Sequence, residues 1–591
     1  MSVWQSGLYV LSDLTWAVSA FLLVVIWGQI LIFRWFQKLA SDRLTRVELF
    51  ALGTAGAILP FALAVILFAV FFDWFGAFAK TAVFVTAIAA LFFMLLRRGE
   101  RTASPGGYWI IFLFAVSIFL HLAFLQKAFL PSYFDSAEHY RIARYFSEYF
   151  GELSGVWPLT NYYHIGYHLM TASFSEWFHV SLVDSMLVFG QVMISLLPFS
   201  LFFMVRRETR SNAAALFTSL LAGFGWHMPG HAVNWGKYPA LLGLLFVQFV
   251  MCVAWLMWRD ETFKRERKKL FPILVLGVLI SGFVHTRMLI VYAVLLLSLL
   301  VLAFWRRLSD SSKRMSIILV LAILALEIGM INSKDILEPL FSSYLRNDLV
   351  LSGLVLFLAV FSLQAFTEIS FFILVVLALL LPGLFVPING LIPGYSVLVL
   401  LDRPFVQMIL YIPLSVLGGL GLAGLVIFAK KVSVRPNAVA RLAVACVFGA
   451  ALLQSVFVYK YSPSECCQIV GRDDLTAINW LDENLPKEAE IVIASEELFI
   501  TTAERVELQP GLDGGIWITP LTSRATVLKS RGLKFDQPEV SNDLCNGKVP
   551  YVYVGGEPQS FDNSLLESKA DWYQVVLSLP DAKIYKAILC E

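Results

Sequence analysis

The chain has 591 residues, of which 58% are hydrophobic and 15% are charged, and its formal net charge at pH 7 is +2. With a mean hydropathy of +0.74, a soluble globular fold could not keep this much apolar surface out of water, so that class is excluded. Lys and Arg gather in short loops between apolar runs and form no basic face, so no nucleic-acid partner is expected. The composition predicts a polytopic α-helical membrane protein whose partner is the lipid bilayer.

Fourteen apolar runs have about the length, 17–25 residues, that a helix needs to cross a bilayer. The first run lacks a basic segment before it and a small-residue cleavage site after it, so we expect a retained helix and no signal peptide. The spans are expected near residues 14–33, 49–72, 78–96, 107–126, 182–205, 211–226, 238–258, 270–285, 288–305, 315–331, 349–366, 368–386, 405–428 and 439–459.

Basic residues are distributed unequally between the two sides of the predicted bundle. Six loops on one side hold 24 Lys and Arg residues, whereas all segments on the other side before residue 461 hold ten. The six loops are 34–46, 97–101, 206–210, 259–269, 306–314 and 430–441. Because basic loops stay in the cytoplasm, we expect both termini and the polar tail 461–591 to be extracytoplasmic at the cell membrane.

The tail 461–591 has the composition of a soluble domain and predicts an α/β fold. Leu475, Ile478 and Leu481 recur at helical spacing, and Pro486 closes that helix. The stretches "AEIVIAS", "VPYVYVGG" and "YQVVLSL" are typical of strands.

Four of the six cysteines, Cys466, Cys467, Cys545 and Cys590, belong to the tail. An even set on the outer side is compatible with two disulfides. Since neighbouring cysteines rarely pair with each other, we expect Cys466 and Cys467 each to be joined to Cys545 or Cys590. Free buried thiols are the alternative.

The predicted orientation gathers the polar motifs on the outer side. The loop after the fourth span, 127–181, begins with Asp135, Glu138 and His139 in "PSYFDSAEHYRIARYFSEYFG". Polar groups at membrane depth are costly unless they serve a cavity, so this gathering predicts a functional site. The other motifs on that side are "NYYHIGYH" with His164 and His168, "GWHMPGHAVNWGKYP" with His231, Asn234, Trp235 and Lys237, "HTR" with His285 and Arg287, and "LDRPF" with Asp402 and Arg403.

Two short helices at the membrane surface are expected within the loop 127–181. In the first, Tyr140, Ala143 and Phe146 form an apolar stripe and Arg141 and Arg144 face elsewhere. The second covers "YYHIGYHLMTASFSEWF". Asp135 stands at the start of the first helix, where capping of backbone N–H groups is the alternative to a catalytic role.

The stretch "YFDSAEH", early in a long outer loop with two juxtamembrane helices, resembles the GT-C class of membrane glycosyltransferases. That class includes protein O-mannosyltransferases, aminoarabinose transferases and oligosaccharyltransferase catalytic subunits. The stretches "YYHIGYH", "NWGKYPALLG" and "DGGIWITPLTSR" are similar to those of prokaryotic multispan members. The chain departs from the class in its three added N-terminal spans and in lacking a clear Asp-x-Asp pair and the "WWDYG" signature.

The resemblance implies a domain plan and a substrate class. A GT-C-like module at 107–348 would lie between N-terminal helices at 1–106 and C-terminal helices at 349–460, with the tail 461–591 outside. The stretch "NSKDILEPLFSSYLRND" would take the place of the mobile substrate loop of the class. The implied donor is a sugar linked to polyprenyl phosphate, and the implied catalytic residue is a carboxylate of the first outer loop.

Inverting transfer from a lipid phosphate needs a base that takes the acceptor's proton, which one carboxylate can supply. Asp135 is the first candidate, and Glu138, three residues on, shares its helix face. Arg403, Lys237 and Arg287 are candidates for binding the donor phosphate, although each could instead anchor the chain at lipid headgroups. The expected substrate-binding residues are His139, His164, His168, His231, Asn234, Trp235 and His285.

The sequence identifies no certain cofactor, and it has no ATP-binding motif. A divalent metal is one option at His164 and His168, which are four residues apart, if one helix runs through both. Hydrogen bonding to a sugar hydroxyl, or packing at the interface, is the favoured interpretation. His227 and His231 have the same spacing, but Pro229 and Gly230 are expected to break the helix, so the pair is not expected to point along one helix face.

In the tail, "QPGLDGGIWITPLTSR" combines glycine with Asp513, Trp517 and Arg524. This composition suits sugar binding by stacking and hydrogen bonds. A tight turn packed against the membrane domain is the alternative.

The leading hypothesis is therefore a membrane glycosyltransferase that transfers a sugar from a polyprenyl-phosphate donor on the outer face to a glycan, lipid or protein acceptor. The second is a transporter or flippase of lipid-linked sugars, which usually has broken helices near the midplane and repeat symmetry; neither is clear in the sequence. The third is a non-catalytic assembly subunit whose tail binds a partner.

Overall fold

The computed structural model describes residues 14–40, 43–67, 107–148, 164–332, 344, 347–386, 399–457, 459–496, 498–501, 505–508, 511–546, 550–556 and 559–588. The chain divides into two compact units. The first unit comprises Met1–Gln126, Phe146–Ala232 and Tyr238–Tyr461, and the second comprises Lys127–Tyr145, Val233–Lys237 and Ser462–Glu591. The sequence predicted the tail as a domain. It did not predict that parts of two loops from between the spans fold together with it.

The first unit is helical, as expected of a polytopic membrane protein. Within the described ranges, ten helical segments are long and apolar enough to cross a membrane. They are Thr15–Leu39, Arg46–Val65, Trp109–Lys127, Leu182–Thr209, Tyr238–Arg259, Met288–Arg306, Asp310–Ile331, Thr367–Leu384, Arg403–Val432 and Pro436–Phe457.

Four of the fourteen predicted spans are not among these ten. The span 211–226 is the short helix α10 (Asn212–Leu220) followed by a π-helical turn, Leu221–Gly225. The span 349–366 is the shorter apolar helix α17 (Leu349–Ala365), and 270–285 is α13 (Arg267–Val284). The span 78–96 lies outside the described residues.

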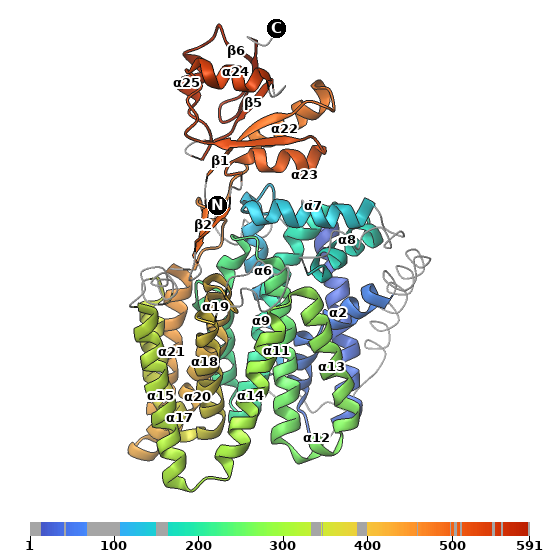
Figure 1. Ribbon diagram of the computed structural model, residues 1–591. Coiled ribbons are helices and arrows are strands. Elements are labelled where there is room, and N and C mark those ends of the chain that lie inside the picture. Colours follow the sequence, from blue (N-terminus) through green and yellow to red (C-terminus); the bar gives the residue numbers. More distant parts are fainter. Residues whose placement is uncertain are drawn as a thin grey trace. The chain divides into compact units, whose positions relative to one another are not determined.

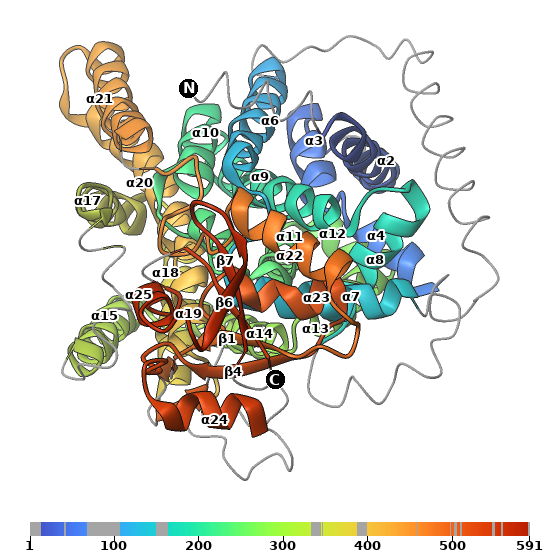
Figure 2. The same cartoon turned by 90° about the horizontal axis from the view of Figure 1, so that it is seen from above.

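Helix α9 (Leu182–Thr209) lies at the centre of the first unit, and Figure 2 shows it among its neighbours. Ser181 caps it, because the Ser181 side chain accepts a hydrogen bond of 3.0 Å from the Asp184 N–H. Every residue from Ser185 to Val205 is buried, which fits a helix that is apolar all round. The helices that contact α9 include α2 (Thr15–Ala40), α3 (Arg46–Ala55), α6 (Gly107–Leu122), α8 (Gly166–Phe178), α10, α11 (Tyr238–Arg259) and α20 (Tyr411–Val432).

A second part of the first unit is organised around α20, which packs along α17. A Cβ atom at Gly421 would lie 2.2 Å from the Leu358 carbonyl oxygen, so only glycine allows this close approach of two helix backbones. The remaining helices of the unit are α4 (Leu59–Val65), α12 (Glu261–Arg265), α14 (Met288–Arg306), α15 (Asp310–Asn332), α18 (Thr367–Leu380), α19 (Arg403–Ile409) and α21 (Pro436–Phe457).

Basic loops that the charge pattern assigns to one side of the membrane contact one another. Arg207, from the loop 206–210, forms an ion pair of 2.5 Å with Asp260 and donates a hydrogen bond of 2.8 Å to the Arg43 carbonyl. Arg259 lies 3.7 Å from Glu208. Three of the six predicted loops therefore meet at one end of the helices.

The second unit contains a five-stranded mixed sheet in the order β4-β1-β5-β7-β6. Its strands β1, β5 and β6 are labelled in Figure 1. Strand β1 pairs in parallel with β4 and β5, whereas β7 is antiparallel to both β5 and β6. All five residues of β1 are buried, as expected of a central parallel strand. The strands are β1 (Ile491–Ser495), β4 (Thr526–Ser530), β5 (Tyr551–Val554), β6 (Tyr573–Ser578) and β7 (Lys583–Ala587), with β2 (Leu498–Thr501) and β3 (Arg505–Leu508) in a separate antiparallel pair.

The three predicted strands coincide with β1, β5 and β6, and the predicted tail helix is α22 (Arg472–Asn484). The core of the sheet includes Val492, Val552 and Tyr585 from its strands, with Phe535 and Phe561 packed against them. The other helices of the second unit are α7 (Phe134–Glu148), most of which belongs to it, α23 (Ile518–Thr522), α24 (Pro538–Asn546) and α25 (Asn563–Glu567).

The predicted disulfide pairing was wrong, because Cys466 and Cys467 are joined to each other. The Cys467 and Gln468 N–H groups both donate to the Ser464 carbonyl, at 2.9 and 3.1 Å, so the pair lies in a tight turn. The prediction rested on the rarity of bonds between neighbouring cysteines and took no account of this local turn. Cys545 is also in a disulfide, and Cys590 lies outside the described residues.

Candidate functional site

Asp135 is the second residue of α7, in its first turn. Its carboxylate forms an ion pair with Lys237 Nζ, although the two residues are 102 positions apart in the chain. The capping alternative fails, because no described backbone N–H donates to this carboxylate. The side chain of Asp135 keeps 23% of its surface exposed, so the carboxylate is only partly buried.

The backbone on both sides of this ion pair is left-handed. Gly236 has φ +63°, and a Cβ atom there would lie 2.5 Å from Ser136 Oγ and 3.2 Å from Asp135 Cβ. Tyr133 has φ 70°, a conformation that costs a residue other than glycine about 1–3 kcal/mol. The segment 233–237 is therefore packed directly against the first turn of α7.

A third segment, the turn 464–468 with the paired cysteines, holds the other two in place. The Tyr133 N–H donates to the Cys467 carbonyl at 2.9 Å, and the Ser464 N–H donates to Asn234 Oδ1 at 2.8 Å. Gln468 Nε2 donates to the Lys127 carbonyl. Three segments distant in sequence thus interlock around Asp135.

Asn234 and Trp235, predicted to bind substrate, belong to this interlocked region. Asn234 is 2% exposed and accepts the Ser464 hydrogen bond, which joins the segment 233–237 to the turn 464–468. Trp235 is half-buried beside it.

Glu138 and His139 differ from Asp135 in their surroundings. The Glu138 carboxylate accepts two hydrogen bonds from Arg141, at 2.6 and 2.8 Å, in an exposed pair. His139 is buried. Asp135 and Glu138 were predicted to share one helix face, but they have different partners: Asp135 pairs with Lys237, and Glu138 pairs with Arg141. Asp135 therefore remains the stronger candidate for a base.

Tyr133 is a member of this group that the sequence interpretation missed. Burial raises the pKa of its phenol, the Asp135 charge raises it further, and Lys237 opposes the shift. The phenol therefore stays protonated near neutral pH and keeps its O–H donor. Its position two residues before Asp135 was the available signal.

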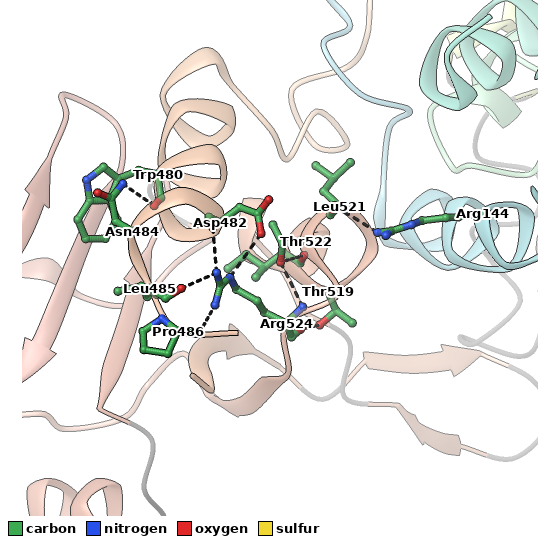
Figure 3. Close-up of polar contacts among 11 residues, drawn as sticks. Arg144, Trp480, Asp482, Asn484, Leu485, Pro486, Thr519, Leu521, Thr522 and Arg524 are labelled. Atoms are coloured by element: carbon green, nitrogen blue, oxygen red, sulfur yellow. Dashed lines mark hydrogen bonds and ion pairs between the residues drawn. The ribbon is translucent and has the colours of Figure 1, made fainter. Parts of the chain in front are cut away.

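Helix α7 is bound to the tail by its later residues. Arg144 donates to the carbonyls of Pro520 and Leu521, at 2.7 and 3.2 Å, at the end of α23 (Figure 3). One turn earlier, the Tyr140 ring makes an edge contact with Trp517 at a centroid distance of 5.5 Å. The tail thus fixes the helix that carries Asp135.

The three residues of the stretch 511–524 that were expected to suit sugar binding, Asp513, Trp517 and Arg524, are all buried. Arg524 is 2% exposed and donates to the carbonyls of Asp482, Leu485 and Pro486 at the end of α22 (Figure 3). A guanidinium is well placed there, because it satisfies the last carbonyls of the helix. Trp517 is fully buried and its ring contacts Tyr140 of α7, so this part of the stretch packs within the second unit.

Asp513 lies in a buried polar network of the tail. Its carboxylate accepts from the Gly515 N–H at 3.0 Å and from the Ser560 hydroxyl. Burial raises the pKa of Asp513 to about 7, the nearby Asp474 charge adds to the shift, and the two hydrogen bonds oppose it. The network holds the chain at the carboxyl ends of β1 and β5.

In the first unit, residues of three predicted outer motifs converge. The Arg287 guanidinium lies 2.6 Å from the Asp402 carboxylate, which also accepts from the Phe405 N–H at 2.9 Å as the cap of α19. The His285 ring stacks on Phe405 at 5.2 Å and lies 4.2 Å from the His164 ring. Burial, with a smaller effect from the Arg287 charge, lowers the pKa of His164 to about 3, so its imidazole is neutral.

Arg403 is the first residue of α19, and its Nε atom is buried without a hydrogen-bond partner among the described residues. Of the three cations predicted to bind phosphate, Lys237 pairs with Asp135 and Arg287 pairs with Asp402. No described carboxylate pairs with Arg403. Arg403 is therefore the cation best able to receive an anionic ligand.

The option of a metal at His164 and His168 is not supported by the helix geometry. Helix α8 begins at Gly166, so His164 precedes it and the two side chains do not lie on one helix face. His168 is fully buried beside Tyr167. Within each unit, the described residues bring no three ligand atoms of His, Cys, Asp or Glu together for a metal ion.

Pro229 and Gly230 interrupt the helix as predicted, because residues 226–229 form bends and turns and a short 3-10 helix begins only at Gly230. The two histidines nevertheless lie side by side, since the His231 N–H donates to the His227 carbonyl at 2.9 Å. The two rings stack at 4.1 Å. Burial lowers the pKa of His227 to about 4 and that of His231 to about 3, so both imidazoles are neutral at pH 7. The predicted substrate loop at 332–348 falls mostly outside the described residues.

The chain was compared with known protein families and with curated proteins. A family model described as a family of unknown function, DUF6541, matches residues 43–381, which is more than half of the chain. No curated protein matches the sequence.

Proposed function

The chain belongs to the DUF6541 family, whose function is unknown, and we propose that it is a membrane glycosyltransferase that takes a sugar from a polyprenyl-phosphate donor. The acceptor is a hydroxyl-bearing glycan, lipid or protein on the outer face of the membrane. The resemblance of "YFDSAEH" and its loop to the GT-C class supports the reaction type.

The observation that carries the proposal is the ion pair of Asp135 with Lys237 at the start of α7. Its carboxylate is partly exposed, and backbone from three distant segments fixes its place. A general base needs both access to its substrate and a fixed position, and Lys237 orients the carboxylate.

In the proposed reaction, the acceptor hydroxyl oxygen bonds to the anomeric carbon of the sugar. The bond from that carbon to the phosphate oxygen breaks, and the acceptor's proton passes to the Asp135 carboxylate. The lipid phosphate leaves with the bonding electrons and gains negative charge. A guanidinium such as Arg403 stabilises that charge, and the Arg287–Asp402 pair with its cap of α19 holds Arg403 in position.

The test is transfer of a labelled sugar by the purified full-length protein in lipid nanodiscs, with a panel of polyprenyl-phosphate-linked sugars. Asp135→Asn should reduce kcat by at least about 100-fold, since a general base contributes about 10²–10⁴-fold. The matched control is Glu138→Gln, one turn further along α7. It removes only an exposed ion pair and should change kcat less than about threefold.

Thermal unfolding of both variants verifies that they remain folded. Wild-type transfer by folded Asp135→Asn would refute the assignment of the base. Absence of transfer by the wild type, together with movement of lipid-linked sugar across the bilayer, would replace the enzyme with a transporter.

A further inference from the structure

The first unit contains a cavity of about 520 Å³ that the proposed reaction does not use. It lies where the ends of α3, α9, α11 and α12 meet, among the basic loops that the charge pattern assigns to the cytoplasmic side. Its volume falls within the range of about 300–1,000 Å³ that is usual for small-molecule sites. Its lining includes Arg206, Arg207, Arg210 and Arg259, with Trp255 and Leu256 as apolar surface.

Four carboxylates also line the cavity, and each already has donors in the protein. Glu48 accepts from the N–H and the hydroxyl of Thr45, at 2.8 and 3.0 Å, in the cap of α3. Asp260 pairs with Arg207 at 2.5 Å.

The other two carboxylates, Glu208 and Glu261, also have donors within the protein. Glu208 accepts from Trp255 Nε1 at 2.8 Å and lies 3.7 Å from Arg259 Nε. Glu261 pairs with Lys264.

Of the four arginines that line the cavity, Arg206 and Arg210 are the two without an ion pair in the described part of the chain. Neither side chain has a hydrogen bond with any described residue, and Arg206 Nε is buried without a partner. The negative end of the α9 dipole favours cations here by only about 0.3–1 kcal/mol and supplies no acceptor to that buried N–H. A buried unsatisfied donor is costly, so a ligand that offers an acceptor to Arg206 Nε would be bound favourably.

We propose that this cavity binds a phosphorylated ligand, with the phosphate held by Arg206 and Arg210. Guanidinium groups donate pairs of parallel hydrogen bonds to phosphate oxygens, which matches two unpartnered arginines in one cavity. Trp255 and Leu256 contact the ester portion of the ligand. The ligand is either an anionic phospholipid headgroup or a soluble phosphate ester, since basic pockets between membrane helices on the cytoplasmic side suit both. This site is independent of the proposed transferase activity.

The experiment measures binding to the full-length protein purified in neutral detergent. One arm adds phosphatidylglycerol, with phosphatidylcholine as its control, and the other adds glycerol 3-phosphate, with glycerol as its control. Binding is followed by the shift in thermal unfolding as each probe is titrated. The variants are Arg206→Gln and Arg210→Gln, and Arg210 is exposed, so its replacement should leave folding intact.

The matched control is Arg307→Gln, an exposed arginine at the end of α14, also in a predicted basic loop but outside the cavity. Each cavity variant should weaken the apparent affinity at least about tenfold, the effect of losing one charged hydrogen bond. Arg307→Gln should leave it unchanged.

A shift with phosphatidylglycerol alone identifies a lipid site, and a shift with glycerol 3-phosphate identifies a site for soluble esters. Either supports the proposal if it depends on Arg206 and Arg210. Equal weakening by Arg307→Gln would show diffuse electrostatics and overturn it. No shift of the wild type with either probe would also overturn it.

Discussion

Asp135 owes its position to a glycine a hundred residues further along the chain. Gly236 takes up φ +63° and contacts the first turn of α7 so closely that a Cβ atom would overlap Ser136 Oγ. Ser136 itself donates its hydroxyl to the Ser132 carbonyl and has little freedom to move. The ion pair of Asp135 with Lys237 therefore depends on glycine at this one position.

Gly236→Ala tests this dependence. A left-handed alanine is unfavourable by about 1 kcal/mol and the overlap adds to it, so we expect a loss of at least about 1–3 kcal/mol in the free energy of unfolding. The control is Gly449→Ala, because a Cβ atom there meets nothing within 4 Å. Thermal unfolding of the purified variants measures the stability of each. Equal stability of Gly236→Ala and Gly449→Ala would show that the first turn of α7 does not depend on glycine at position 236.

Sequence patterns selected the candidate residues but could not assign their partners. Asp135, Lys237, Arg287 and Arg403 were all predicted as site residues, and the motifs of His164, His285 and Asp402 do converge. The pairing of Lys237 with Asp135, and of Arg287 with Asp402, instead of with phosphate could not be predicted. The pattern gives the side of the membrane and the helix end, whereas ion pairing depends on distances of a few ångströms between segments distant in sequence.

At the scale of elements, α7 behaves as part of the tail. Its Arg144 satisfies two carbonyls at the end of α23, where the helix dipole also favours a cation. The sequence predicted that Arg144 would face away from the apolar stripe. It could not predict that the residue would contact a segment more than 370 positions later.

Arg144→Gln should loosen α7 from α23. Loss of a hydrogen bond from a charged donor is worth about 1.5–3 kcal/mol, which corresponds to at least about tenfold faster hydrogen exchange in residues 134–145 and 518–522. The control is Arg141→Gln, which removes only the exposed pair with Glu138 and should leave exchange nearly unchanged. Hydrogen–deuterium exchange with mass spectrometry on the full-length protein makes the comparison.

The tail should lose stability as the pH rises. The pKa of Asp513 is raised from 3.8 to about 7 by burial, so between about pH 4 and pH 7 the folded state holds a proton that the unfolded state releases. This stabilisation is complete below the unfolded pKa and is lost as the pH rises through about 7.

We expect the exchange protection of β5, corrected for the intrinsic pH dependence of exchange, to fall by roughly 1–4 kcal/mol between pH 5 and pH 8. Asp513→Asn should remove most of this dependence. Asp562→Asn, at the exposed cap of α25, should retain it. The same slope in both variants would show that Asp513 is not the responsible group.

Elements with a strong local pattern were predicted, and those decided by tertiary contacts were not. Strands β1, β5 and β6 and helix α22 follow from apolar spacing and closing residues. The span 211–226 is helical from Asn212 to Gly225, but α10 gives way after nine residues to a π-helical turn with two glycines, which hydropathy does not predict. The turn at Ser464, which brings Cys466 and Cys467 together, has no signal in the spacing of cysteines.

At the scale of the whole molecule, hydropathy alone predicted a polytopic helical protein. The contacts of Arg207 with Asp260 and with the Arg43 carbonyl agree with the grouping of three basic loops on one side. Hydropathy does not fix the number of spans in the same way. Helices α10 and α17 lie in predicted spans but are shorter than the 18 residues required of a membrane-crossing helix.

The proposed transferase reaction requires the carboxylate of α7 and the cations near α19 to face the same side of the membrane. Accessibility of single cysteines tests it in intact cells, in a background where the free, exposed Cys446 is replaced by serine. The positions are Glu138→Cys on α7, Thr286→Cys beside Arg287, and Arg307→Cys in a predicted cytoplasmic loop, all exposed.

A membrane-impermeant maleimide is added before and after permeabilisation of the cells. We expect positions 138 and 286 to be labelled in intact cells, and position 307 to be labelled only after permeabilisation. Labelling of positions 138 and 286 from opposite sides of the membrane would contradict the account, because the proposed base and the proposed phosphate-binding cation could then not act on one substrate.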